Sequence, residues 1–155
     1  MIPEIPEAVH AGAEDVPWVE NIAYPGTMMR LLRADLREGT YVMAGRLPAG
    51  LAVGTHRHIG AVHMFTLSGA WGYREHGFVN RAGSYLYEPP GSTHTLFVPA
   101  DNTEVTETLT IVHGITEYLD ADGNVVAVSD AAATLRGYYA SCEAAGIPRP
   151  SGILL

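Results

Sequence analysis

The feature that most constrains the fold is a series of short strand-like segments separated by glycine, proline and asparagine. From about residue 28, β-branched and aromatic residues favour extended structure, as in residues 40–47 and 84–88. Residues 104–112 alternate polar and apolar side chains, which is typical of a strand with one buried face. Many short strands with turn signals between them predict an all-β sandwich or barrel.

The two ends of the chain depart from this pattern. Residues 1–20 contain three prolines and are expected to form an extended N-terminal arm. Asp130 precedes an alanine-rich run and is expected to cap a C-terminal helix. The predicted organisation is therefore an arm over residues 1–20, a barrel over residues 21–128, and a helix and tail over residues 129–155.

Histidines lie close together in the middle of the chain. His56 and His58 are two residues apart, so their rings leave the same face of a strand and can bind one metal ion together. His94 follows a Pro-x-Gly turn that directs the chain into a new strand. Neutral imidazole suits iron, zinc, copper and nickel, so these residues predict a metal site without selecting the metal.

A fourth histidine, His63, follows a break at residues 59–61. If the break resets the strand, His63, Phe65 and Leu67 share the inward face. His63 is then a fourth nitrogen ligand, a hydrogen-bonding or proton-transfer group just outside the ligand set, or a side chain with a packing role alone.

Composition limits the class of protein. A length of 155 residues predicts one domain, and a charged fraction of only 17% favours a homodimer or a higher homo-oligomer. A net charge of -8 without any lysine argues against nucleic acid as a partner. The chain shows neither a signal peptide nor an apolar run of membrane-spanning length, and it has one cysteine, so we expect a soluble cytoplasmic protein.

Residues 50–69 and 83–94 resemble the two motifs of the cupin superfamily, G-x5-H-x-H-x4-E-x5-G and G-x5-P-x-G-x2-H. The resemblance implies a single jelly-roll β-barrel (a double-stranded β-helix) that binds one metal through His56, His58 and His94. His63 stands where the family usually has a glutamate ligand, so the site would lack a carboxylate ligand.

In finer detail, residues 16–147 resemble the 2,4'-dihydroxyacetophenone dioxygenase group of cupins and, more distantly, the acetylacetone-cleaving cupins. This resemblance implies an enzyme that uses O2 to cleave a C–C bond next to a carbonyl in a small α-hydroxyketone or diketone. The expected cofactor is Fe(II), with Zn, Ni, Mn and Cu as alternatives. The alternative functions are a redox-neutral metal enzyme (isomerase, lyase or cyclase) and a non-enzymatic metal or ligand sensor.

Several side chains are candidates for roles beside the metal. His63 or Glu75 is expected to remove the substrate proton. An aromatic substrate pocket is expected from Phe65, Tyr73, Tyr87 and Phe97, with ordinary barrel packing as the alternative for the same residues. Glu88 and Thr93 flank the second motif, where either can hydrogen-bond a ligand ring.

Overall fold

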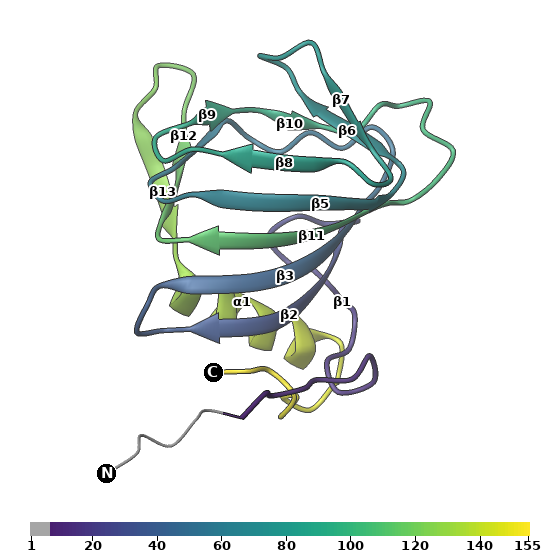
Figure 1. Cartoon of the computed structure of the whole chain (residues 1–155), viewed down its shortest axis with the longest axis vertical. Helices are drawn as coiled ribbons and strands as arrows, with labels where there is room; N and C mark the ends of the chain where they lie inside the picture. The colour runs from purple at the N-terminus through teal and green to yellow at the C-terminus, as the bar shows by residue number, and fades with distance from the viewer. Residues whose placement is uncertain (1–6) are drawn as a thin grey trace.

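The computed structural model describes residues 7–155 as a β-barrel with one helix (Figure 1). Residues 1–6 of the expected N-terminal arm lie outside the described residues. The strands are β1 (Val19–Glu20), β2 (Met28–Asp35), β3 (Thr40–Leu47), β4 (His56–His58), β5 (Val62–Ser68), β6 (Ala70–Tyr73), β7 (Val79–Arg81), β8 (Tyr85–Glu88), β9 (Thr93–His94), β10 (Leu96–Phe97), β11 (Thr106–His113), β12 (Thr116–Leu119) and β13 (Val125–Ser129), and the helix is α1 (Ala131–Ala144).

The strands form three sheets. The largest has the order β1-β2-β3-β11-β5-β8, and its neighbouring strands are all antiparallel. The two smaller sheets have the orders β10-β6-β7 and β13-β12-β4-β9. Because β11 lies between β3 and β5, strands distant in sequence become neighbours, as a jelly roll requires. The predicted all-β class is confirmed, and the predicted domain boundaries stay a prediction.

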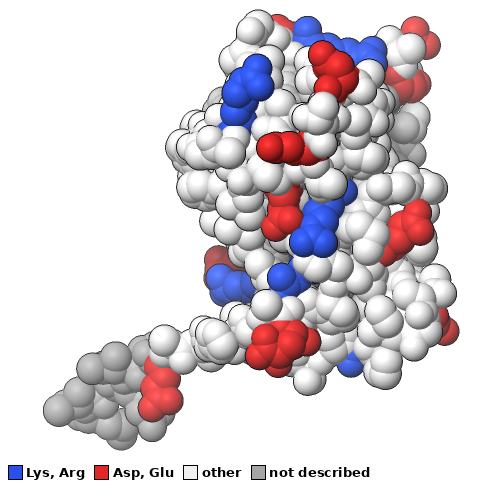
Figure 2. Space-filling view, turned by 90° about the vertical axis from the view of Figure 1, so that its right-hand side faces the viewer, with Lys and Arg blue, Asp and Glu red and all other residues white. Residues whose placement is uncertain are grey.

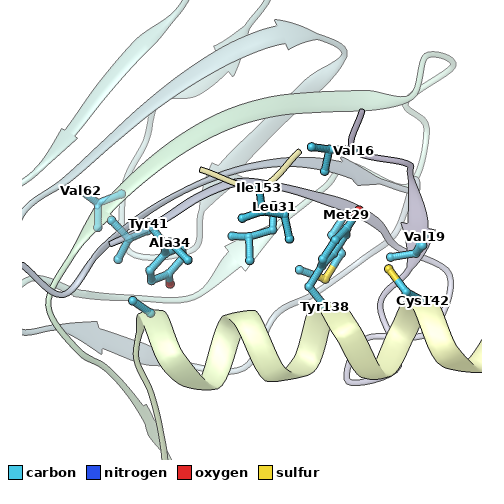
Figure 3. Packing of buried hydrophobic residues seen from close by; sticks show 12 residues of the cluster. Val16, Val19, Met29, Leu31, Ala34, Tyr41, Val62, Tyr138, Cys142 and Ile153 are labelled. Atoms are coloured by element: carbon cyan, nitrogen blue, oxygen red, sulfur yellow. The ribbon is translucent and has the colours of Figure 1, made fainter. Parts of the chain in front are cut away.

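The helix begins where the sequence predicts. Asp130 is extended at φ −139°, and its side chain accepts a hydrogen bond of 2.7 Å from the backbone N–H of Ala133. One face of α1 packs against the large sheet, where Tyr138 lies beside Met29 of β2 and Cys142 lies beside Val19 of β1 (Figure 3). The helix therefore closes the part of the large sheet that the two smaller sheets leave uncovered.

A second apolar cluster fills the barrel beside the histidines. Met64 of β5 packs with Trp71 and Tyr73 of β6 and with Leu96 of β10. Gly69 joins β5 to β6 at φ +70°, and a β-carbon there would lie 2.6 Å from the Cα of Thr106. Only glycine allows both this conformation and this close approach, which explains the last glycine of the first motif.

Charged side chains are sparse on the surface. Figure 2 shows acidic and basic groups interspersed over one face, with broad uncharged areas between them. Opposite charges also pair across strands, as in the 2.9 Å contact between Arg46 of β3 and Glu107 of β11. Within residues 7–155, no helix is both long enough and apolar enough to cross a membrane.

Candidate metal centre

The three histidines of the two motifs lie together inside the barrel. His56 and His58 are buried on one face of β4, while Arg57 between them points away and pairs with Glu117 at 2.6 Å. His94 lies directly opposite His56 in the β4–β9 pairing. One ligand atom from each of the three rings lies within 4.8 Å of the others. The three-histidine cluster can therefore hold a divalent metal ion.

The Pro-x-Gly turn brings the second motif to the first. The backbone N–H of Gly91 donates to the carbonyl of His58 at 2.7 Å, and the N–H of His58 donates to the carbonyl of Ser92 at 3.1 Å. Gly91 has a φ of +86°, which favours glycine at this point of the turn. Backbone hydrogen bonds thus fix His94 against β4 without any contribution from its side chain.

Neighbouring groups orient the rings. The Nδ1 of His56 lies 2.9 Å from the carbonyl of Gly54, and the Nδ1 of His58 lies 3.1 Å from the hydroxyl of Thr116. Such contacts leave Nε2 of each ring for a metal. Burial lowers the pKa of His58 to about 4, against the opposing charge of Glu88, and burial also lowers the pKa of His56. Both rings are therefore neutral at pH 7, the form that binds metal.

A buried carboxylate faces the cluster. Glu88 ends β8, and its Oε2 lies 3.3 Å from Nε2 of His58 and 3.2 Å from Nε2 of His94. Its other oxygen, Oε1, accepts a hydrogen bond from the hydroxyl of Tyr73. Burial would raise the pKa of Glu88, but His94, His58 and Tyr73 outweigh burial and lower this pKa below its usual value. Glu88 is therefore ionised at neutral pH.

Two atoms of this group lack a partner. The Oε2 of Glu88 and the Nε2 of His94 are both buried without a hydrogen bond. A buried polar atom without a partner costs free energy, so such atoms are rare unless an ion or water binds there. A cation among these donors would satisfy the Nε2 of His94 and would complement the charge of Glu88. The residues present therefore fit a divalent metal.

The structure corrects the expected position of His63. On β5, Val62, Met64 and Thr66 are the buried side chains, so His63, Phe65 and Leu67 do share a face, but it is the outer one. The Nδ1 of His63 lies 2.7 Å from the hydroxyl of Tyr85, also on the outer face. Within the described residues, the cluster that could hold a metal does not include His63. The carboxylate beside the cluster is Glu88, one of the two residues expected to contact a ligand ring.

The expected substrate pocket is also divided. Phe65 and Tyr87 lie on the outer face of the large sheet and are 39% and 50% exposed. Tyr73 is inside, with its ring stacked on His94 at 3.9 Å between centroids. Phe97 lines a separate surface hollow together with Tyr73 and His76. These four aromatic residues do not line one common pocket.

Glu75 follows β6 and is mostly exposed. Its Oε2 accepts a hydrogen bond of 2.9 Å from the backbone N–H of Thr95, next to His94. The pKa of Glu75 is lowered because its hydrogen bonds to Thr95 outweigh the desolvation that would raise it. This geometry fits a carboxylate that positions the strand of His94, and a catalytic role for Glu75 stays a prediction.

Sequence reasoning missed two inward-facing residues, Thr116 and Tyr118 of β12. They lie beside His58 and His56 in the β12–β4 pairing. The local sequence of β12 does not predict this position, because the pairing joins residues that are 58 and 62 positions apart.

The inward position of Glu88 could be predicted in part from the sequence. Leu86 and Glu88 alternate with Tyr85 and Tyr87, so one of the two pairs had to face inward.

Most of the chain matches a known protein family. Residues 6–117 match the family described as the ChrR cupin-like domain. The chain belongs to this cupin family. The predicted membership of the cupin superfamily is therefore confirmed. A search of curated protein sequences finds no match.

Solved structures agree with this family. An RmlC-like cupin protein from Ralstonia eutropha JMP134 is 29% identical, with a TM-score of 0.88 over 99% of this cupin and 98% of that chain. An acetylacetone dioxygenase from Acinetobacter johnsonii is 22% identical, with a TM-score of 0.74 over 88% of this cupin and 93% of that chain. The anti-sigma factor ChrR of Rhodobacter sphaeroides, in complex with SigE, is 21% identical, with a TM-score of 0.53 over 65% and 51%. The last two likenesses concern the fold alone.

Proposed function

We propose that this cupin is a non-haem iron dioxygenase that cleaves the C–C bond next to a carbonyl in a small α-hydroxyketone or diketone. His56, His58 and His94 would hold the Fe(II) ion. The observation that carries the proposal is the buried carboxylate of Glu88, whose Oε2 has no hydrogen-bond partner beside the three-histidine cluster. Similar folds in acetylacetone dioxygenases support this choice of reaction class.

A bound Fe(II) ion would polarise the substrate oxygens and exchange electrons with O2. The chain's own part is to handle the proton. Glu88 is ionised, and its Oε2 faces the cluster without a hydrogen bond, so it would accept the proton from the carbon next to the carbonyl. The hydroxyl of Tyr73 donates a hydrogen bond to Oε1 of Glu88, and the ring of Tyr73 stacks on His94. Tyr73 therefore fixes the position of the carboxylate relative to the His94 ring.

The overall conversion is balanced without a further reductant. For an α-hydroxyketone, R–CO–CH2OH and O2 give R–COOH and HCOOH, so the C–C bond breaks and each acid gains one oxygen atom of O2. The buried position of the cluster excludes bulk water from the reacting atoms.

The same carboxylate favours a second candidate, a metal-binding domain without catalysis. Three histidines and Glu88 can form a closed set of four donors, which is typical of structural zinc sites. The ChrR fold, which occurs in an anti-sigma factor, supports this alternative. A redox-neutral enzyme would bind a metal through the same histidines but would not consume O2. A polyketide cyclase from Streptomyces resistomycificus has a similar fold, with a TM-score of 0.54.

The test combines metal analysis with O2 uptake. Protein isolated without air is analysed for iron and zinc, and O2 consumption is then measured with α-hydroxyketones and β-diketones. The dioxygenase proposal expects bound iron, O2 uptake with at least one of these substrates, and acid products. Stoichiometric iron without uptake for any carbonyl substrate would refute it, and zinc that resists a chelator would favour the non-catalytic domain.

Two variants separate the roles of the donors. His94→Ala should lose most of the metal while the circular dichroism spectrum is retained, because the barrel has its own apolar cores. Glu88→Gln keeps the shape of the side chain and should keep the metal but lose O2 uptake. Loss of the metal from Glu88→Gln would instead make Glu88 a ligand and would remove the proton-accepting role.

A further inference from the structure

A cavity of about 260 Å³ lies between the inner face of β2 and β3 and the helix α1. Its lining consists of apolar side chains, tyrosines and small polar residues, and none of the lining residues is charged. These residues are Asn21, Ala23, Tyr24, Thr27, Met28, Met29, Tyr41, Met43, Gly45, Leu47, Leu51, Val53, Tyr118, Ser129, Ala133, Thr134 and Gly137.

The cavity shares a wall with the metal centre. Tyr118 lines the cavity and also pairs with His56 across β12 and β4. The ring centroids of Tyr118 and His56 are 6.1 Å apart. Tyr118 is therefore at once part of the cavity wall and the neighbour of a ring of the cluster.

The helix sets one limit of the cavity. Ala133, Thr134 and Gly137 of α1 face it, and all three have small side chains or none. An ideal β-carbon on Gly137 would have no atom within 4 Å, so the space next to this residue is open. An apolar cavity of about 150 Å³ can hold a benzene molecule, so this larger cavity can hold one ring with small substituents.

Polar groups in the cavity are hydroxyls. Tyr24 and Tyr118 lie with their rings 6.5 Å apart, and the hydroxyl of each can donate or accept a hydrogen bond. An anion would find no positive charge among the lining residues, and burial of an unpaired charge is costly. The lining therefore matches an uncharged molecule that carries at least one hydrogen-bonding oxygen.

We propose that this cavity binds an uncharged, mostly apolar group no larger than one substituted six-membered ring, and that the small residues of α1 set the size limit. The inference deepens the proposed function, on which it rests for the statement that the bound group is part of the substrate. The C-terminal helix is then part of the specificity site, although it contributes no residue to the metal centre.

The methionines provide a direct test on the full-length protein. Met28, Met29 and Met43 line the cavity, whereas Met64 packs in the other apolar cluster. Phenol is titrated into protein labelled with ¹³C at the methionine methyl groups. The three cavity methyl signals should shift while the Met64 signal does not. Benzoate, an anion of similar size, and 2-naphthol, which has two fused rings, should each leave all four signals in place.

Helix variants test the size limit. Gly137→Leu places a side chain in the open space and should reduce phenol affinity at least tenfold, and Ala133→Leu serves as a second variant with the same expectation. The control, Ala144→Leu, adds the same side chain to an exposed end of α1 outside this cavity and should bind phenol as the parent does. The proposal is overturned if phenol shifts no cavity methyl, if benzoate binds equally well, or if both cavity variants bind phenol normally.

Failure of the cavity proposal can be distinguished from failure of the dioxygenase proposal. Phenol binding requires neither O2 nor turnover, so a protein that binds phenol but consumes no O2 would refute only the dioxygenase. A dioxygenase whose cavity methyl signals do not respond would refute only the cavity.

Discussion

The hydrogen bond from Tyr73 to Glu88 gives the sharpest prediction about the metal centre. Tyr73→Phe removes only the hydroxyl, and the ring can keep its 3.9 Å stacking on His94. Tyr73 and Glu88 are each only 3% exposed, so water cannot readily replace the lost hydrogen-bond donor. The variant therefore isolates one buried hydrogen bond to a charged acceptor.

The magnitude follows from the charge of that acceptor. A hydrogen bond to a charged group contributes roughly 1.5–3 kcal/mol, and one to a neutral group roughly 0.5–1.5 kcal/mol. We expect the free energy of unfolding to fall by about 2 kcal/mol at pH 7. For a chain of this length, that loss lowers the Tm by about 4–8 °C.

The loss should depend on pH, with a defined sign. The pKa of Glu88 in the folded protein lies below its usual value of 4.5, so its ionisation stabilises the fold above the unfolded pKa. This stabilisation is lost as the pH falls through the folded pKa. Without the hydroxyl, the pKa of Glu88 rises and less stabilisation remains. The difference between variant and parent is therefore largest near neutral pH and shrinks once Glu88 is protonated.

The assay is urea unfolding of metal-free protein, followed by circular dichroism at pH 7 and at a pH low enough to protonate Glu88. Tyr85→Phe is the matched control, because it removes a tyrosine hydroxyl that contacts His63 from a side chain that is 54% exposed. An equal loss for Tyr73→Phe at both pH values, or an equal loss in the two variants at pH 7, would refute the reasoning.

Three further variants test the fold and the correction at residue 63. His63→Ala should keep metal content and O2 uptake within twofold of the parent, because His63 lies on the outer face, and loss of metal in elemental analysis would contradict that placement. Asp130→Ala removes the helix cap and should cost about 1 kcal/mol in urea unfolding, while an unchanged midpoint would show that the cap contributes nothing. Leu31→Ala empties a fully buried position between β2 and α1 and should cost about 2–5 kcal/mol, and a loss below 1 kcal/mol would contradict tight packing there.

The homo-oligomer and the cytoplasmic location stay predictions, as does the identity of the metal. The exposed apolar side chains Phe65, Leu67, Tyr85 and Tyr87 lie on the outer face of the large sheet, where a second copy would have to bury them. Within the large sheet, the same alternation that exposes these residues points Met64 and Glu88 inward.

The sequence by itself determined the features that depend on near neighbours. The spacing of His56 and His58 places both rings on one face, since side chains alternate along any strand. Asp130 caps the helix through a hydrogen bond to a residue three positions away. The Pro-x-Gly turn before His94 is equally local.

Only the tertiary structure decided which face of a strand became the interior. Alternation shows that His63 and Phe65 share a face, but the burial of that face depends on what β5 packs against, and the break at residues 59–61 carries no such information. The packing of β8 in the barrel likewise buries Glu88 and exposes Tyr87. Tyr24, Tyr118 and α1 line one cavity because segments about a hundred residues apart pack together, and packing between distant segments follows from the whole fold rather than from local spacing.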